Sequence, residues 1–105
     1  MRRTFYPKPK ILEKLSQEDQ LDLFFDLINA FRIVKSPTDT TLLVKDLFTT
    51  SEIKHLAKRL RIAKLLLKNE NQRDIAKKLH CSVATVTKVS YWLNSGGNGF
   101  KKVIE

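Results

Sequence analysis

The chain has 105 residues, 42% of them apolar, and a formal net charge of +9 at pH 7. This length favours one small domain with a modest core, and the lack of an apolar run of about eighteen residues excludes a membrane-spanning segment. Residues 1–15 carry five Lys or Arg against one acid, residues 16–49 three against six, and residues 50–105 twelve against four. A basic half of this kind favours a polyanion as partner. The N-terminus lacks an apolar signal core, so we expect a cytoplasmic protein.

Residues 1–15 are predicted to form a basic arm ahead of a single helical domain over residues 16–105. Pro7 and Pro9 exclude a helix at the start of this arm, because proline lacks the backbone donor that a helix interior needs. Two interpretations of the arm remain open: an auxiliary contact with the DNA backbone or minor groove, or a solvated terminus.

The first helix is expected from Ser16 to about Val34. Ser16 is a helix-capping residue type, and Asp19 places an acid in the first turn. The apolar side chains cover a wider arc than one neighbouring helix needs, so this helix is a candidate subunit interface. The arc consists of Leu21, Leu23, Phe24, Phe25, Leu27, Ile28 and Phe31.

Pro37 begins a short second helix, and its strongly apolar sequence predicts that it is buried. Its apolar residues are Leu42, Leu43, Val44, Leu47 and Phe48.

Thr49 and Glu52 form a capping box for a third helix over about residues 50–68. The predicted apolar stripe of this helix is Ile53, Leu56, Ala57, Leu60, Ala63, Leu66 and Leu67. The opposite side carries Lys54, Lys58, Arg61, Lys64 and Lys68, which is either a solvated face or, in part, a phosphate contact.

The stretch 72–91 has the pattern of a helix-turn-helix. Asn71 and Ser82 are positioned to cap its two helices, and apolar residues fall on the facing sides of both helices, namely Ile75, Ala76 and Leu79 on the first and Val86 and Val89 on the second. His80 stands in the turn, where glycine is usual and a positive φ is expected. A short amphipathic helix with Phe100, Val103 and Ile104 is predicted after Gly96 and Gly97, giving about six helices and an all-α fold.

The outward face of this motif suits entry into the major groove of DNA, because its residues are small, hydroxyl-bearing or cationic. The predicted DNA-binding residues are Gln72, Arg73, Lys77, Ser82, Val83, Ala84, Thr85, Thr87 and Lys88. The alternative for the same pattern is a solvated helical hairpin that binds no nucleic acid.

Catalytic and metal chemistry have little support in the sequence. His55 and His80 are isolated, and Cys81 is the only cysteine, so no metal-ligand spacing occurs and Cys81 is interpreted as a small core residue. The glycines at 96–99 follow a helix and read as a turn rather than a phosphate-binding loop. We expect the protein not to be an enzyme.

Over about residues 42–95 the chain resembles the bacterial tryptophan-repressor family. The similarity rests on Leu-Phe-Thr-Thr-Ser-Glu at 47–52, Lys-Arg-Leu-Arg-Ile-Ala-Lys-Leu-Leu-Leu at 58–67, Gln-Arg-Asp-Ile-Ala at 72–76 and Ala-Thr-Val-Thr-Lys-Val-Ser at 84–90. The resemblance implies an intertwined homodimer whose two helix-turn-helix motifs address half-sites about one helical turn apart on pseudo-palindromic DNA.

The resemblance also indicates an effector pocket, and here the sequence departs from the family. The family holds an indole between two arginines and beside a serine, and the corresponding positions are Arg59, Lys88 and Trp92. Lysine lacks the planar group that stacks on an indole, and Trp92 would crowd a bound tryptophan. Our hypothesis is that Trp92 fills the cavity and no tryptophan corepressor or other cofactor is needed. Simple packing of Trp92 in the core is the alternative.

The sequence thus predicts a transcriptional regulator, a repressor, that binds double-stranded DNA as a homodimer. Two alternatives belong to other classes: the DNA-binding subunit of a transposase, and a helical protein-interaction module that binds no DNA.

Overall fold

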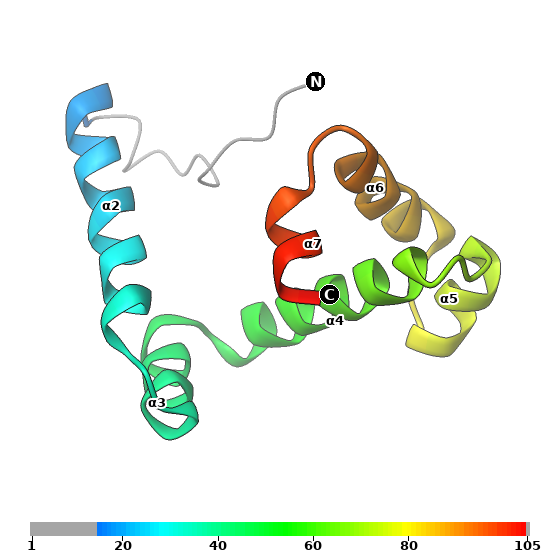
Figure 1. Cartoon of the computed structure of the whole chain (residues 1–105), viewed down its shortest axis with the longest axis horizontal. Coiled ribbons are helices and arrows are strands. Elements are labelled where there is room, and N and C mark those ends of the chain that lie inside the picture. Colours follow the sequence, from blue (N-terminus) through cyan, green and yellow to red (C-terminus); the bar gives the residue numbers. More distant parts are fainter. Residues whose placement is uncertain (1–14, 105) are drawn as a thin grey trace. The chain divides into compact units, whose positions relative to one another are not determined.

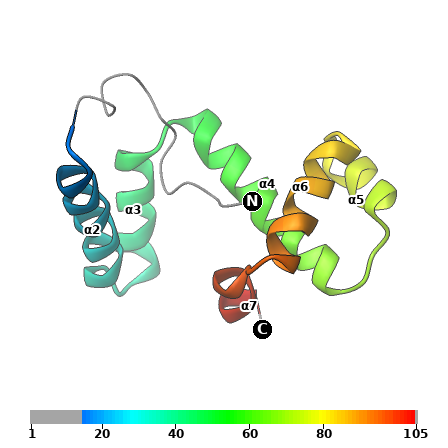
Figure 2. The same ribbon diagram turned by 90° about the horizontal axis from the view of Figure 1, so that it is seen from above.

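The computed structural model describes residues 15–104, and in them it contains six α-helices and no strand (Figure 1). The helices are α2 (Gln17–Ile33), α3 (Pro37–Leu47), α4 (Thr50–Leu67), α5 (Gln72–Leu79), α6 (Val83–Asn94) and α7 (Asn98–Ile104). Figure 2 gives the same helices from above. The predicted all-α fold with about six helices is confirmed, whereas the predicted arm lies outside the described residues except for Leu15.

The chain divides into two compact units, Met1–Leu47 and Phe48–Glu105. In the first unit, hydroxyl caps start both helices: the Ser16 hydroxyl accepts from the Asp19 backbone N–H at 3.0 Å, and the Ser36 hydroxyl accepts from the Asp39 N–H at 3.0 Å. Each cap satisfies a donor that the first turn of a helix leaves without a partner. The predicted start signals at Ser16 and Pro37 are therefore confirmed.

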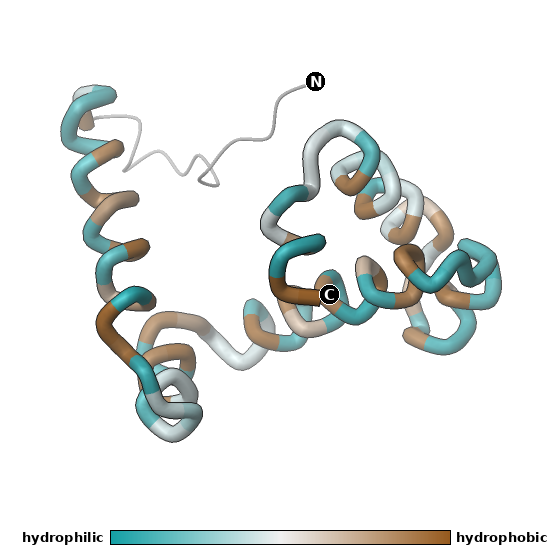
Figure 3. The backbone as a smooth tube through the Cα atoms, in the orientation of Figure 1, coloured by the Kyte–Doolittle hydropathy of each residue, from teal (hydrophilic) through white to brown (hydrophobic). Residues whose placement is uncertain are grey.

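The first unit has no buried residue on either helix. Figure 3 shows hydrophobic residues recurring along α2 and α3, yet Ile33 is 70% exposed and Leu42 56% exposed. Two helices alone cannot enclose an apolar arc as wide as that of α2, because each covers only one stripe of the other. The prediction that the helix beginning at Pro37 is buried is therefore wrong for the single chain.

The second unit contains the hydrophobic core. Helix α4 contacts α5, α6 and α7, and α5 packs against α6. Side chains from three of these helices supply every buried residue among the described ones, namely Ile62, Ala63, Ile75, Ala76, Val86, Val89 and Leu93. The core thus lies where α4 meets the predicted helix-turn-helix, and it holds the two helices of that motif in place.

Helix α4 begins at the predicted capping box. The Thr49 hydroxyl accepts from the Glu52 N–H at 3.1 Å, and the Glu52 carboxylate accepts from the Thr49 N–H at 2.9 Å. Its predicted apolar stripe is only partly right. Ile62, which the stripe omitted, is fully buried beside Ala63, whereas Leu56 and Leu60 are each more than a third exposed. The core packs against the C-terminal half of α4, so the leucines nearer its N-terminus remain uncovered in the single chain.

Helix α7 begins earlier than the sequence indicated, because Asn98 and Gly99 of the predicted turn belong to the helix. Gly97 has φ +57°, and a Cβ atom there would lie 2.7 Å from the Leu93 Cα, so this turn requires glycine. Phe100 and Ile104 pack against the core as predicted, but Val103 faces solvent. None of the helices described between residues 15 and 104 has the length and apolar character that crossing a membrane requires.

Candidate nucleic-acid interface

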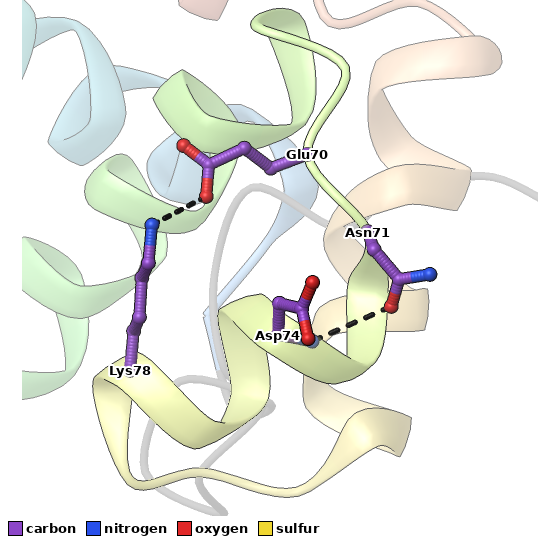
Figure 4. Close-up of polar contacts among 4 residues, drawn as sticks. All are labelled: Glu70, Asn71, Asp74 and Lys78. Carbon is purple, nitrogen blue, oxygen red and sulfur yellow. Dashed lines mark hydrogen bonds and ion pairs between the residues drawn. The ribbon is translucent and has the colours of Figure 1, made fainter.

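Two side-chain caps fix where the helices of the motif begin. The Asn71 side-chain oxygen accepts from the backbone N–H groups of Arg73 and Asp74, at 2.8 and 3.4 Å, and so caps α5. Figure 4 shows the bond between Asn71 and Asp74. The Ser82 hydroxyl caps α6 by accepting from the Thr85 N–H at 3.1 Å. Both caps were predicted from the sequence. They matter because α5 has only eight residues, and a helix this short is marginal without capping and packing.

The turn between the helices depends on His80. This residue ends α5 in the left-handed region, with φ 52° and ψ 50°, and the next residue, Cys81, donates its backbone N–H to the Ala76 carbonyl at 3.1 Å. That geometry closes the last turn of α5 and redirects the chain into α6. The positive φ expected for His80 is confirmed. Cys81 is partly buried against the core, consistent with its interpretation as a small core residue.

The helix-turn-helix pattern is also confirmed on its inner side. Ile75 and Ala76 of α5 and Val86 and Val89 of α6 are buried in one cluster, and Leu79 packs against it. Because an α-helix has 3.6 residues per turn, burying Val86 and Val89 directs the intervening positions outward.

The predicted DNA-binding residues lie on the solvent side of the motif. Eight of the nine are exposed: Arg73, Lys77, Ser82, Val83, Ala84, Thr85, Thr87 and Lys88. Gln72 is partly covered, because its side-chain oxygen accepts a hydrogen bond from the Thr87 hydroxyl at 2.9 Å. This bond brings the first turn of α5 beside the outward face of α6. Lys77 lies in the last turn of α5, and within residues 15–104 no side-chain hydrogen bond or ion pair links it to the other eight.

The cations of the motif differ in whether an acid neutralises them. Lys78 forms an ion pair with Glu70 at 2.6 Å, which ties α5 to the segment that precedes it (Figure 4). Within residues 15–104, Arg73, Lys77 and Lys88 have no such partner. Exposed cations without an acid partner are available to a polyanion. The sequence analysis missed the Lys78 ion pair, because only the fold brings Glu70, in the segment between α4 and α5, next to the C-terminal end of α5.

A pocket of about 230 Å³ lies between α4 and α6. Its walls are His55, Lys58, Arg59, Ile62, Thr85, Lys88, Val89 and Trp92. The Arg59 guanidinium carbon lies 5.0 Å from the centre of the Trp92 ring, a cation–π geometry. The structure thus brings together all three residues of the predicted effector pocket.

The sequence analysis missed the other walls of this pocket, including His55, Lys58 and Thr85. Helical spacing could have identified them. The α4 residues of the pocket recur at intervals of three and four from His55, and the α6 residues do so from Thr85, so each set lies on one face of its helix. Four of the eight lining side chains are basic types and none is acidic. No group of three His, Cys, Asp or Glu side chains within the described part of the chain could hold a metal ion.

Comparison with known proteins decides the family. The family described as Trp repressor protein matches residues 19–105, a span that covers nearly all of α2 and every later helix. The chain belongs to the Trp repressor family. Its members are DNA-binding helix-turn-helix regulators rather than enzymes, and the suspected family relationship is confirmed. A comparison with curated proteins gives no match.

Replacing His80 with glycine tests the strain in the turn of this Trp repressor family member. Glycine adopts the left-handed region without a steric penalty, so His80→Gly should increase the free energy of unfolding by about 1 kcal/mol, measured by urea denaturation. Asn69 also has a positive φ, of 63°. Because asparagine tolerates this region better than most residues, the control Asn69→Gly should gain less. A loss of stability in His80→Gly would contradict this interpretation of the turn.

Proposed function

We propose that the protein is a transcriptional repressor that acts as a homodimer and occupies a pseudo-palindromic operator. The observation that carries the proposal is the two-sidedness of α6. Val86 and Val89 are buried, whereas Thr85, Thr87 and Lys88 are exposed to solvent. The N-terminus of α6 is capped by Ser82 and is also exposed to solvent. A helix that is anchored on one side and presents small residues and a cation on the other fits the major groove.

The residues divide into two roles in this proposal. Arg73, Lys77 and Lys88 supply the charge that contacts phosphates, and Gln72 and Ser82 add neutral polar contacts at the two helix starts. Val83, Ala84, Thr85 and Thr87 form the surface that meets base edges, where methyl groups fit the C5-methyl of thymine. Phosphate contacts set the position of α6, and the base contacts then select the sequence.

The test is selection of bound sites from random duplexes, followed by binding measurements across a range of salt concentrations. We expect a site with two half-sites roughly 10 base pairs apart, and an affinity that falls steeply with salt. Arg73→Ala and Lys88→Ala should each reduce the slope of log K against log salt by about 1. Lys101→Ala, an exposed lysine of α7, is the matched control and should leave the slope unchanged. Failure to recover any duplex would favour a protein-interaction module.

The proposed dimer rests on uncovered apolar side chains. Eight large apolar residues of the first unit that the structure describes are exposed: Leu15, Leu21, Leu23, Phe25, Ile28, Ile33, Leu42 and Leu47. Soluble monomers rarely expose apolar surface in such concentration, whereas an obligate dimer buries it in a shared core. A second copy of the chain is the expected partner, because symmetric homodimers use one such surface twice.

Dilution tests the proposed dimer. Sedimentation should find a dimer at micromolar concentration, and the melting temperature should fall on dilution, since dimerisation contributes to stability by mass action. Leu42→Glu should weaken dimerisation by about tenfold or more, because burying a leucine contributes roughly 1.5–3 kcal/mol. Thr41→Glu adds the same single negative charge to α3 at a polar exposed position and should have a much smaller effect. A monomer at every concentration would contradict the dimer.

We also propose that the protein needs no tryptophan corepressor. The Trp92 ring beneath Arg59 occupies one side of the pocket, and the space of about 230 Å³ that remains is below the roughly 300–1,000 Å³ of most small-molecule sites. Lys88 lines the same pocket but cannot stack on an indole as arginine does. The protein's own indole thus takes the place beside Arg59.

Calorimetric titration with L-tryptophan tests this proposal. We expect no saturable heat and no change in operator affinity when L-tryptophan is added, because Trp92 holds the site. Trp92→Phe keeps an aromatic ring beneath Arg59 and should behave as the original protein does. Binding of one tryptophan per chain at micromolar strength would refute the proposal without affecting that of DNA binding.

A further inference from the structure

One side-chain hydrogen bond joins the two helices of the motif on its outward side. The Thr87 hydroxyl lies 2.9 Å from the Gln72 side-chain oxygen and also 2.9 Å from the Val83 carbonyl oxygen. Gln72 is the first residue of α5, and Thr87 lies fifteen positions later on the exposed face of α6. The bond therefore links the start of one helix to the face that the other helix presents to DNA.

The hydroxyl of Thr87 has one proton, and both of its acceptors belong to the protein. A threonine hydroxyl donates only once, so the proton is shared between the Val83 carbonyl and the Gln72 oxygen. Phosphate oxygens, guanine N7 and O6, and thymine O4 are all acceptors and need a donor from the protein. Thr87 has no proton left for them. Its methyl group and the acceptor lone pairs of its oxygen remain for contact with a base.

The amide of Gln72, unlike the Thr87 hydroxyl, still has protons to donate. Its oxygen accepts from Thr87, and its NH₂ group has two protons with no described acceptor within residues 15–104. Gln72 lies next to the exposed Arg73 in the first turn of α5, close to the capped helix start. An amide whose oxygen is anchored and whose donors are unused is oriented to donate to an anion.

We propose that Gln72 and Thr87 act as one unit in DNA binding: Thr87 anchors the Gln72 amide, and Gln72 donates its N–H to a backbone phosphate. This inference rests on the proposed DNA-binding function and assigns roles within it. Gln72 is a neutral phosphate contact that Thr87 positions. Thr87 itself meets the bases through its methyl group and does not donate a hydrogen bond to them.

The two contacts then depend on each other. Phosphate contacts fix the register of the recognition helix on the duplex, and the link runs from the phosphate through Gln72 to the face of α6. Removing the Thr87 hydroxyl should therefore weaken a contact made by another residue. Loss of a donor that contacts a base edge would instead change the preference for one base.

A double-mutant cycle on DNA affinity tests the unit, with the duplex recovered by selection as the probe. Valine has nearly the shape of threonine, so Thr87→Val removes the hydroxyl and keeps a methyl group. Gln72→Ala should weaken binding by about tenfold and Thr87→Val by about threefold, and the double variant should be no weaker than Gln72→Ala alone. None of the three should alter the salt slope or the base preference, because the amide is uncharged.

Two further variants make the outcome specific. Thr85→Val is the matched control on the same helix. The Thr85 hydroxyl bonds to Ser82 and not to Gln72, so the loss of affinity in Thr85→Val should multiply with the loss in Gln72→Ala. Thr87→Ser keeps the hydroxyl and loses the methyl, and should change base preference while its coupling to Gln72 persists. Thermal melts should be unchanged, since these side chains lie at the surface.

Independent effects of Gln72→Ala and Thr87→Val would overturn the inference, as would a change of base preference in Thr87→Val. In either case, binding of the original protein to the duplex leaves the proposed function standing. If the original protein binds no duplex at all, both the inference and the proposed function fail.

Discussion

The buried contact of α4 with the helix-turn-helix is the constraint on which the rest of the structure depends. Ile62, Ile75, Val86 and Val89 are almost completely removed from solvent, and together they fix the rotation of α6 about its own axis. Once Val86 and Val89 face inward, helical periodicity turns Thr87 and Lys88 outward, while Thr85, one turn before Val89, is exposed and lines the pocket between α4 and α6. The face proposed to contact DNA is thus set by the core behind it.

Short-range polar contacts then stabilise the two short helices α5 and α6 that present this face. Asn71 and Ser82 satisfy donors at the helix starts, and His80 closes α5 in the left-handed conformation. These devices act within a few residues, so they can be read directly from sequence. The core contributes rigidity, and the caps determine where each helix begins.

This division explains what sequence reasoning predicted and what it missed. The capping box at Thr49, the positive φ of His80 and the inner face of the motif depend on local chemistry or on helical period, and all were predicted. The ion pair of Lys78 and the bond between Gln72 and Thr87 depend on how helices cross, and neither was predicted. The three effector-pocket residues were grouped through a family resemblance, because nothing in their spacing joins Arg59 to a helix so far along the chain.

The same physics accounts for the error over burial. Leu42 was expected inside because an apolar helix needs a covering, but sequence alone does not say which chain supplies that covering. In the single chain nothing does, and all described buried residues belong to α4, α5 and α6. Leu56 and Leu60 were misplaced for the same reason, since helical period marks an apolar stripe without locating the element that packs on it.

Net charge differs between residues 16–49 and residues 50–105, and the difference supports separate roles for the two segments. Residues 16–49, which carry most of the uncovered apolar surface, have six acids against three basic residues, whereas residues 50–105 have twelve basic residues against four acids. In the proposed dimer, the apolar segment joins two chains and its net negative charge disfavours contact with phosphates. In the same proposal, the basic segment supplies the attraction to DNA. If only the joined chains present two reading helices to one duplex, operator affinity and dimer formation are linked by mass action, and loss of either weakens the other.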